Sequence, residues 1–203
     1  MNNLPEIIKA IQRVVGQAAD GVFGPVTAAA VWRSLNHGED VGETPTLLTM
    51  DDRSEKTLAT LDPKAQPMFR EFYHLANATA ATFGCSYILI GGNRTWEEQD
   101  ALYAQGRTAG GQIVTMAKGG QSNHNFGIAA DFGVFAGKAY LDNSNPAKAA
   151  MVHKACSIHA EACGLEWGGS WKSIKDLPHY EVETFGLTMA QKRNVFKVRG
   201  SVL

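Results

Sequence analysis

Two short apolar segments of this chain each contain a side chain that is costly to bury. Residues 128–135 alternate as a strand does and carry Asp131 between apolar neighbours, and a second strand-like segment at 179–182 opens with His179. A buried carboxylate needs a cation or several hydrogen-bond donors to compensate it. Successive side chains of a strand point to opposite faces, so Asp131 can face a cleft while its neighbours pack below. These segments predict a polar site built onto a buried sheet.

His124, Asp131 and His179 form a candidate set of zinc ligands. Two imidazoles and one carboxylate leave a fourth position for water, as a hydrolytic zinc site requires, whereas a structural site fills all four positions with protein ligands. Asp176 lies three residues before His179, where it can accept and donate a proton beside the metal without binding the metal itself. The alternative for Asp176 is an exposed loop carboxylate or a helix cap. The prediction depends on all these residues, because a lone histidine is more often structural.

A second set of metal-binding residue types must be weighed against the first. Cys156, His159 and Cys163 are spaced so that all three share one face of a helix, and their donors suit zinc. A single helix face seldom surrounds a metal, however, and small cysteines among alanines fit a buried helix side equally well. We therefore favour a structural role for this set.

Hydrophobic periodicity predicts the secondary structure of the larger part of the chain. The expected helices cover residues 63–83, 95–105 and 146–162, and the expected strands cover 86–90, 112–116, 128–135 and 179–182. Thr95 and Glu98 have the spacing of a capping box at the start of the second helix. Helices and strands do not alternate regularly, so the pattern favours an α+β fold.

The 203 residues are enough for one well-cored domain and a smaller one. We expect a helical module at 1–37, a linker rich in glycine and charge at 38–53, and a catalytic domain at 54–203. The turn around Asp20 and Gly21, between two short helices, resembles the end of a peptidoglycan-binding helical module. The alternative is a helical hairpin that only packs on the main domain.

Composition excludes several classes of protein. The formal net charge of -1 offers no basic surface for nucleic acid. No apolar run approaches the roughly 20 residues of a membrane span, so we expect no membrane insertion. The first residues lack the pattern of a secretion signal, which predicts synthesis in the cytoplasm. Three cysteines cannot all pair with one another, so no disulfide framework is expected, and we expect a monomer.

An ordered set of residues between about 54 and 185 resembles one family, the zinc peptidases that include D-Ala-D-Ala carboxypeptidases and L-alanyl-D-glutamate endopeptidases. The resemblance rests on residues 91–95, Gln99, 102–108, 113–115, 119–131, 167–171 and 176–179. It is specific because several uncommon spacings occur in the same order. It implies a small, mainly antiparallel sheet with flanking helices, the DD-peptidase or hedgehog-like zinc peptidase fold.

The resemblance also implies roles for individual residues. It makes His124, Asp131 and His179 the ligands of Zn²⁺ and Asp176 the general acid/base. Arg94 matches an arginine that polarises the scissile carbonyl and stabilises the oxyanion, a role suited to a fixed guanidinium.

Four further positions match family residues that bind substrate or support the site. Ser122 matches a serine beside the metal that contacts substrate, and its alternative is a simple turn residue. Gln99, Arg107 and Thr115 match positions that line or support the site.

Two details bear on which bond is cut. Carboxypeptidases of this family commonly carry glutamate where Asp176 stands, whereas Asp176-x-Pro178-His179 and the Gly-Arg-Thr segment at 106–108 are more similar to bacteriophage endolysins that cut L-Ala-D-Glu. Asn93 stands where an aromatic residue is frequent. The sequence thus predicts a zinc-dependent endopeptidase of endolysin type that acts on the peptidoglycan stem peptide after release from the cytoplasm. The alternatives are a D-Ala-D-Ala carboxypeptidase and a non-catalytic wall-binding protein.

Overall fold

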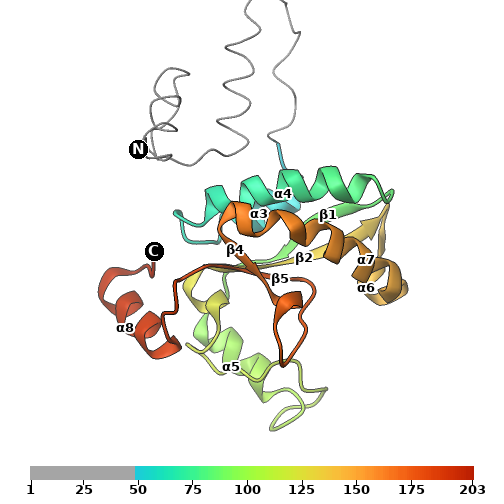
Figure 1. Ribbon diagram of the computed structural model, residues 1–203. Helices are drawn as coiled ribbons and strands as arrows, with labels where there is room; N and C mark the ends of the chain where they lie inside the picture. Colours follow the sequence, from blue (N-terminus) through green and yellow to red (C-terminus); the bar gives the residue numbers. More distant parts are fainter. Residues whose placement is uncertain (1–48) are drawn as a thin grey trace, which may run out of the picture. The chain divides into compact units, whose positions relative to one another are not determined.

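A computed structural model describes residues 49–203 of the chain (Figure 1). The helical module predicted at 1–37 and most of the linker predicted at 38–53 lie outside the described residues. One unit spans Met50–Leu203. Helix α3 (Asp52–Leu58) begins two residues before the predicted start of the catalytic domain at 54. The three domain ranges stay predictions.

The described part of the chain contains one five-stranded sheet in which every pair of strands is antiparallel. Strands β1 (Ser86–Gly91), β2 (Ala129–Ala136), β5 (His179–Val182) and β4 (Leu165–Trp167) lie in that order, and β3 (Ala139–Tyr140) pairs with the far end of β2. The predicted α+β class with a small antiparallel sheet is confirmed. Strands β2 and β5, distant in sequence, are direct neighbours.

Helices cover the two faces of the sheet unequally. Figure 1 shows α4 (Gln66–Ala81) and α7 (Pro146–Cys156) on one side, and α5 (Trp96–Ala104) with the loop after it on the other. Within residues 49–203, the remaining helical segments are α6 (Leu141–Ser144), α8 (Met189–Arg199), η1 (Asn123–Phe126), η2 (Ser157–His159), η3 (Glu161–Cys163) and η4 (Gly168–Ser170). The face opposite α4 is therefore the more open one.

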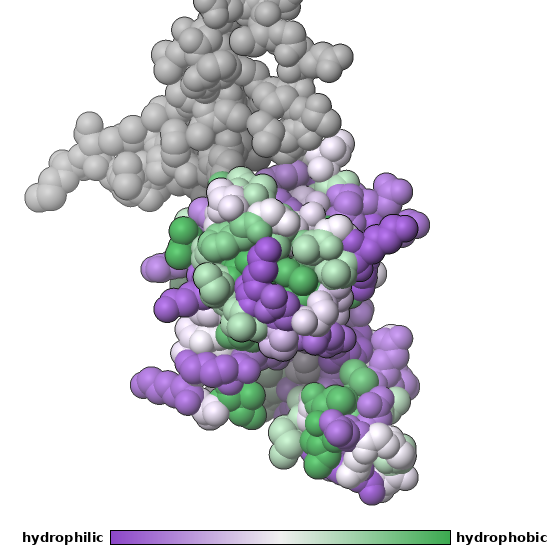
Figure 2. Space-filling model, turned by 90° about the vertical axis from the view of Figure 1, so that its right-hand side faces the viewer, coloured by the Kyte–Doolittle hydropathy of each residue, from purple (hydrophilic) through white to green (hydrophobic). Residues whose placement is uncertain are grey.

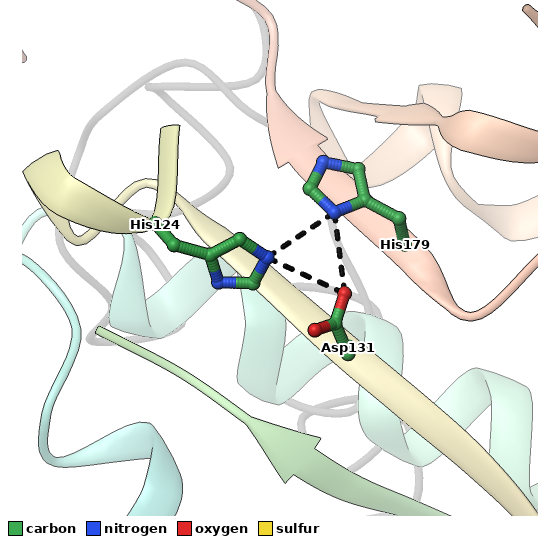
Figure 3. A group of neighbouring side chains, drawn as sticks. All are labelled: His124, Asp131 and His179. Carbon is green, nitrogen blue, oxygen red and sulfur yellow. Dashed lines mark hydrogen bonds and ion pairs between the residues drawn. The ribbon is translucent and has the colours of Figure 1, made fainter. Parts of the chain in front are cut away.

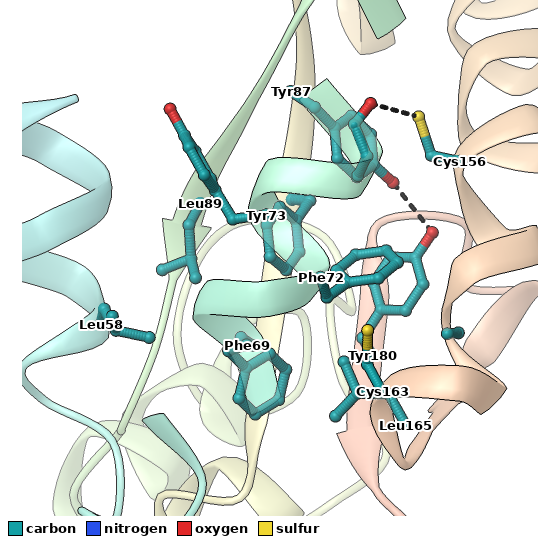
Figure 4. Packing of buried hydrophobic residues seen from close by; sticks show 14 of the residues in the cluster. Leu58, Phe69, Phe72, Tyr73, Tyr87, Leu89, Cys156, Cys163, Leu165 and Tyr180 are labelled. Atoms are coloured by element: carbon teal, nitrogen blue, oxygen red, sulfur yellow. Dashed lines mark hydrogen bonds between the residues drawn. The ribbon is translucent and has the colours of Figure 1, made fainter. Parts of the chain in front are cut away.

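Aromatic side chains join α4 to the sheet (Figure 4). The ring of Phe72 lies 4.3 Å from that of Tyr180 and 5.2 Å from that of Phe132, and Phe132 stacks on Tyr87 at 5.2 Å. All four are completely buried, and each contributes about 1.5–3 kcal/mol by leaving water. Phe132 and Tyr180 point to this face, so their sequence neighbours on β2 and β5 point to the opposite one.

The predicted elements are mostly present, with corrections. The capping box of Thr95 and Glu98 is formed at the start of α5. The predicted strand at 112–116 is wrong: this segment has no strand partner, and Ile113 and Val114 are more than half exposed. The predicted helix at 146–162 ends at Cys156 and continues as η2 and η3. Strand β4 and helix α8 were not predicted.

Exposed hydrophobic side chains occur on separate parts of the described surface. Ile113, Val114 and Met116 lie on the loop after α5, whereas Met151 and Ile158 lie on and beside α7. Figure 2 shows the side at the α6 and α7 end, where hydrophobic groups have hydrophilic side chains between them. Among the described helices, none has the length and hydrophobicity needed to cross a bilayer.

Candidate metal centre

Three side chains converge on the open face of the sheet (Figure 3). His179 Nδ1 lies 3.2 Å from Asp131 Oδ1 and 3.3 Å from His124 Nε2, and His124 Nε2 lies 3.4 Å from Asp131 Oδ1. Both histidines are buried, at 4% and 6% exposure, and Asp131 is partly exposed. The structure thus brings together the three residues predicted as metal ligands, and within the described residues they form the one group with suitable donors.

The backbone explains why these side chains meet. In the antiparallel pairing of β2 with β5, Asp131 stands directly opposite His179, and such pairs hold their side chains close together. His124 comes from η1, which ends at Gly127. Gly127 has a φ of +67°, a conformation that costs glycine little, and it turns the chain from η1 into β2.

The dimensions of the group suit zinc. Tetrahedral ligands at about 2.0–2.1 Å from Zn²⁺ lie about 3.3 Å from one another. The three separations of 3.2, 3.3 and 3.4 Å agree with that spacing. Two imidazoles and one carboxylate are also the ligand types that zinc accepts.

Hydrogen bonds outside the group fix which ring nitrogen faces it. His124 Nδ1 lies 2.8 Å from the carbonyl oxygen of Gly92, and His179 Nε2 lies 2.9 Å from Glu181 Oε2. A carbonyl or carboxylate oxygen accepts only, so both of these nitrogens carry hydrogen. In the neutral form of each ring, the lone pairs of His124 Nε2 and His179 Nδ1 then face each other and Asp131. A metal ion bound between these three atoms would coordinate all of them at once.

The electrostatics of the group also favour positive charge. Burial alone would lower the pKa of His179, but the carboxylates of Asp131 and Glu181 raise it to about 9. Burial would raise the pKa of Asp131, but hydrogen bonds with His124 and His179 hold it well below its usual range. The Asp131 and Glu181 carboxylates thus favour positive charge at His179, and Asp131 stays ionised and available as a ligand.

Asp176 lies beside the group without joining it. Its backbone N–H donates to the carbonyl of Gly168, and its own carbonyl accepts from the N–H of His179. Burial raises the pKa of the Asp176 carboxyl, opposed by the nearby imidazole of His179 and reinforced by the charge of Asp131. The side chain also lines a cavity of about 210 Å³ that reaches α7. The electrostatic interactions with His179 and Asp131 support the prediction that Asp176 lies near the metal, whereas the cavity is lined by none of the three ligand candidates.

Arg94 is held beside His124 by two contacts. Its backbone N–H donates to the carbonyl of His124 at 3.0 Å, and its Nη1 donates to Gln99 Oε1 at 2.7 Å. Gln99 is completely buried and donates to the carbonyl of Ala117 and to Thr115 Oγ1. With no exposed surface, Gln99 does not meet a substrate in this conformation. Of the two predicted roles, lining or supporting the site, the buried position favours the second: Gln99 holds the Arg94 guanidinium.

The other three predicted positions shape the loop after α5 and the segment before η1. Arg107 donates to the carbonyls of Tyr103 and Thr115, and its guanidinium stacks on the Tyr103 ring at 3.9 Å. Thr115 Oγ1 accepts from Gln99 and from the backbone of Ala117. Ser122 caps η1 and is partly exposed two residues from His124. Arg107 and Thr115 thus stabilise the loop after α5, and their predicted roles at the site, like the predicted substrate contact of Ser122, stay predictions.

The competing set of two cysteines and a histidine does not converge. Cys156 Sγ donates to the carbonyl of Ala76, whereas His159 Nε2 pairs with Thr79 Oγ1. Both cysteines are buried, and burial raises the pKa of each thiol to about 12. These residues pack α7 and η3 against α4.

Sequence reasoning missed Glu181, the acceptor for His179. A usable signal was present, since the alternation of β5 places residues 179 and 181 on one face. Two effects oppose each other at this carboxyl. Burial raises the pKa of Glu181, but hydrogen bonds from His179 and Asn123 and the charge of Lys192 lower it below its usual value. A carboxylate that orients a ligating histidine is a common companion of metal sites.

The fold and the group together define an α+β protein with a candidate centre for a single metal ion. A family model described as D-alanyl-D-alanine carboxypeptidase matches residues 115–182. The peptidoglycan L-alanyl-D-glutamate endopeptidase CwlK of Bacillus subtilis (strain 168) is 38% identical over 122 residues, which are 57% of this chain and 72% of that protein. The chain therefore belongs to the zinc peptidase family of D-Ala-D-Ala carboxypeptidases and L-alanyl-D-glutamate endopeptidases.

Two solved structures are also similar. The Serratia marcescens L-Ala D-Glu endopeptidase ChiX is 23% identical, with a TM-score of 0.45 over 66% of this chain and 89% of that one. A variant of the vancomycin resistance D,D-pentapeptidase VanY, in complex with Zn(II), is 16% identical, with a TM-score of 0.40 over 70% of this chain and 80% of that one.

Proposed function

We propose that this protein is a zinc-dependent peptidoglycan endopeptidase that hydrolyses the L-alanyl-D-glutamate bond of the stem peptide. The observation that carries the proposal is the meeting of three metal-binding atoms, on His124, Asp131 and His179, while the second nitrogen of each imidazole is bonded to an acceptor outside the group. The likeness to CwlK supports the choice of bond.

The three residues would hold Zn²⁺ by His124 Nε2, His179 Nδ1 and the Asp131 carboxylate. Zinc bound there supplies a water of lowered pKa and a Lewis acid for the scissile carbonyl. Gly92 and Glu181 keep the two imidazoles in the orientation that ligation needs.

Asp176 and Arg94 supply the remaining chemistry. The Asp176 carboxylate accepts a proton from the attacking water and passes it to the departing amine of D-glutamate. Arg94 has five N–H donors, one of which is used by Gln99. The others can stabilise the negative charge that develops on the carbonyl oxygen.

The narrower assignment to an endolysin is part of the same proposal. It is supported by the resemblance of 106–108 and 176–179 to phage enzymes and of 1–37 to a wall-binding module. In this proposal the protein is made in the cytoplasm as a monomer and reaches the cell wall after release by a separate pore.

A specific observation favours one alternative, D-Ala-D-Ala carboxypeptidase activity. The family model that matches 115–182 carries that description, and the same metal-binding group serves either reaction. The two differ in the bond that must lie beside Asp176.

Product analysis separates the candidates. The full chain, loaded with zinc, is incubated with purified cell walls of known composition, and the soluble products are identified by mass spectrometry and end-group labelling. New N-terminal D-glutamate is the expected product. Release of free D-alanine alone would replace the proposal with the carboxypeptidase, and binding to walls without any product would leave a wall-binding protein.

A further inference from the structure

Helix α8 carries a lysine in an unusual environment. Lys192 is only 4% exposed, although lysine is rarely buried unless its ammonium group has partners. Its Nζ donates to Asn123 Oδ1 at 3.0 Å, in a buried hydrogen bond that joins the C-terminal helix to η1. Asn123 directly precedes the metal-ligand candidate His124.

The amide of Asn123 connects Lys192 to the metal-binding group. Its oxygen accepts from Lys192 at 3.0 Å, and the Asn123 side chain and the charge of Lys192 both lower the pKa of the neighbouring Glu181 carboxyl. Glu181 accepts in turn from His179 Nε2 at 2.9 Å. A path of neighbouring polar groups thus runs from the buried ammonium through Asn123 and Glu181 to a ligand imidazole, with a hydrogen bond at each end.

Other contacts hold α8 against the same segment. Arg193 Nη1 lies 3.4 Å from the carbonyl oxygen of Gly120, and the ring of Phe196 lies 5.3 Å from that of Phe126. Gly120 and Phe126 lie on either side of His124 in the chain. Helix α8 therefore braces the segment that carries one ligand and, through Lys192, the acceptor that orients another.

We propose that Lys192 is a positioning residue of the metal centre: through Asn123 it fixes the Glu181 carboxylate, and so the orientation and electron density of the His179 imidazole. This inference rests on the proposed zinc site. Partners of metal-ligating histidines typically change metal affinity by 10–100-fold when they are altered. The single positive charge of Lys192 also offsets one of the carboxylates gathered around the site.

Zinc affinity of the Lys192→Met variant tests the proposal. Methionine keeps the length and apolar stem of lysine but removes the charge and the donors. The full-length variant is expected to bind zinc about tenfold more weakly than the wild type in competition with a chromophoric chelator. The matched control is Lys197→Met on the exposed side of α8, which is expected to leave the dissociation constant unchanged.

A double-mutant cycle shows whether the effect passes through Glu181. In a Glu181→Gln background, Lys192→Met is expected to add little further loss of zinc affinity, because the path is already broken. Fully additive losses would overturn the path. If Lys192→Met does not fold, as judged by its circular dichroism, Lys192→Gln removes the charge but keeps a donor for Asn123, and unchanged zinc affinity in that variant would overturn the contribution of the charge.

The outcomes separate this inference from the proposed function. Unchanged zinc affinity in a folded Lys192→Met protein would overturn the role of Lys192 and leave the zinc peptidase proposal standing. Failure of the wild type to bind zinc would overturn both. A fall in melting temperature of the zinc-free variant with no change in zinc affinity would show that Lys192 serves packing alone.

Discussion

A substitution at Asp176 can separate the effect on catalysis from the effect on zinc binding. Its carboxyl is not part of the metal-binding group but interacts electrostatically with all three members. We predict that Asp176→Asn lowers kcat by about 10²–10⁴-fold, because proton transfer is lost, while zinc content stays at that of the wild type. Hydrolysis of cell walls and elemental analysis measure the two quantities.

The controls for Asp176 are of two kinds. Asp52→Asn removes an exposed carboxylate in the first turn of α3 and is expected to change neither quantity. His124→Ala and His179→Ala are expected to lose zinc and activity together. Full activity of Asp176→Asn would exclude this residue from the mechanism.

Gly91 makes room for the Asp131 carboxylate. A Cβ at this position would lie 2.8 Å from Asp131 Oδ2, so a side chain displaces the carboxylate from the other two ligands. We predict that Gly91→Ala weakens zinc binding by about tenfold or more, with zinc affinity measured by chelator competition. Gly110→Ala is the control, because a Cβ there meets nothing within 4 Å. Equal zinc affinity in the two variants would show that a Cβ at position 91 does not displace the Asp131 carboxylate.

Single residues were predictable from the sequence where chemistry restricts the choice of side chain. His124, Asp131 and His179 are residue types that zinc requires, and their spacing marked them out. Gln99 was placed at the site but not in its buried role, and Lys192 was not identified at all. Both roles depend on hydrogen bonds to residues distant in sequence, at Ala117 and Asn123, which no local pattern encodes.

At the scale of elements, helix α3 offers a test of pH dependence. Asp51 caps α3 by accepting from the backbone N–H groups of Arg53 and Ser54, and its other oxygen accepts from Tyr73. Burial would raise the Asp51 pKa, but the hydrogen bonds from Ser54 and Tyr73 outweigh it and lower the pKa below 3.8. A pKa that is lower in the folded state adds stability above the unfolded-state pKa, and that stability is lost as the pH falls through the folded-state value.

We therefore predict a pH-dependent difference between wild type and Asp51→Asn, which keeps a capping oxygen but removes the charge. The wild type is expected to have the higher melting temperature at pH 5–7, and the gap is expected to close below about pH 4. Thermal unfolding by circular dichroism across this range measures it. A gap that is constant down to pH 3 would show that the Asp51 charge contributes nothing.

Helices and strands could be predicted where the sequence carries a long local pattern. They could not be predicted where pairing with another strand determines whether a strand forms. The apolar positions of α4 and the capping box of α5 are local signals, and both helices form. Residues 112–116 have the composition of a strand but no partner in the sheet, so propensity alone gave the wrong result. Strand β4 is only three residues long and exists because it pairs with β5.

For the whole molecule, binding of the proposed zinc would be coupled to folding. A ligand that binds only the folded state stabilises it by about 4 kcal/mol at a thousand times its dissociation constant. We predict that zinc raises the melting temperature of the full chain and that a chelator reverses the shift. The same titration on His124→Ala is expected to give no shift. A wild type that melts identically with zinc and with chelator would speak against a bound metal.

The pairing of β2 with β5 has a consequence for how this protein can fail. Tyr180 packs against Phe72 and His179 lies opposite Asp131 because β2 and β5 pair in one particular register. Since the two sides of a strand alternate, sliding β5 by a single position would bury the imidazole among aromatic rings and expose the phenol to solvent. Every atom needed for catalysis would still be present, yet the enzyme would be inert. Its activity is therefore a sensitive gauge of correct strand alignment during refolding.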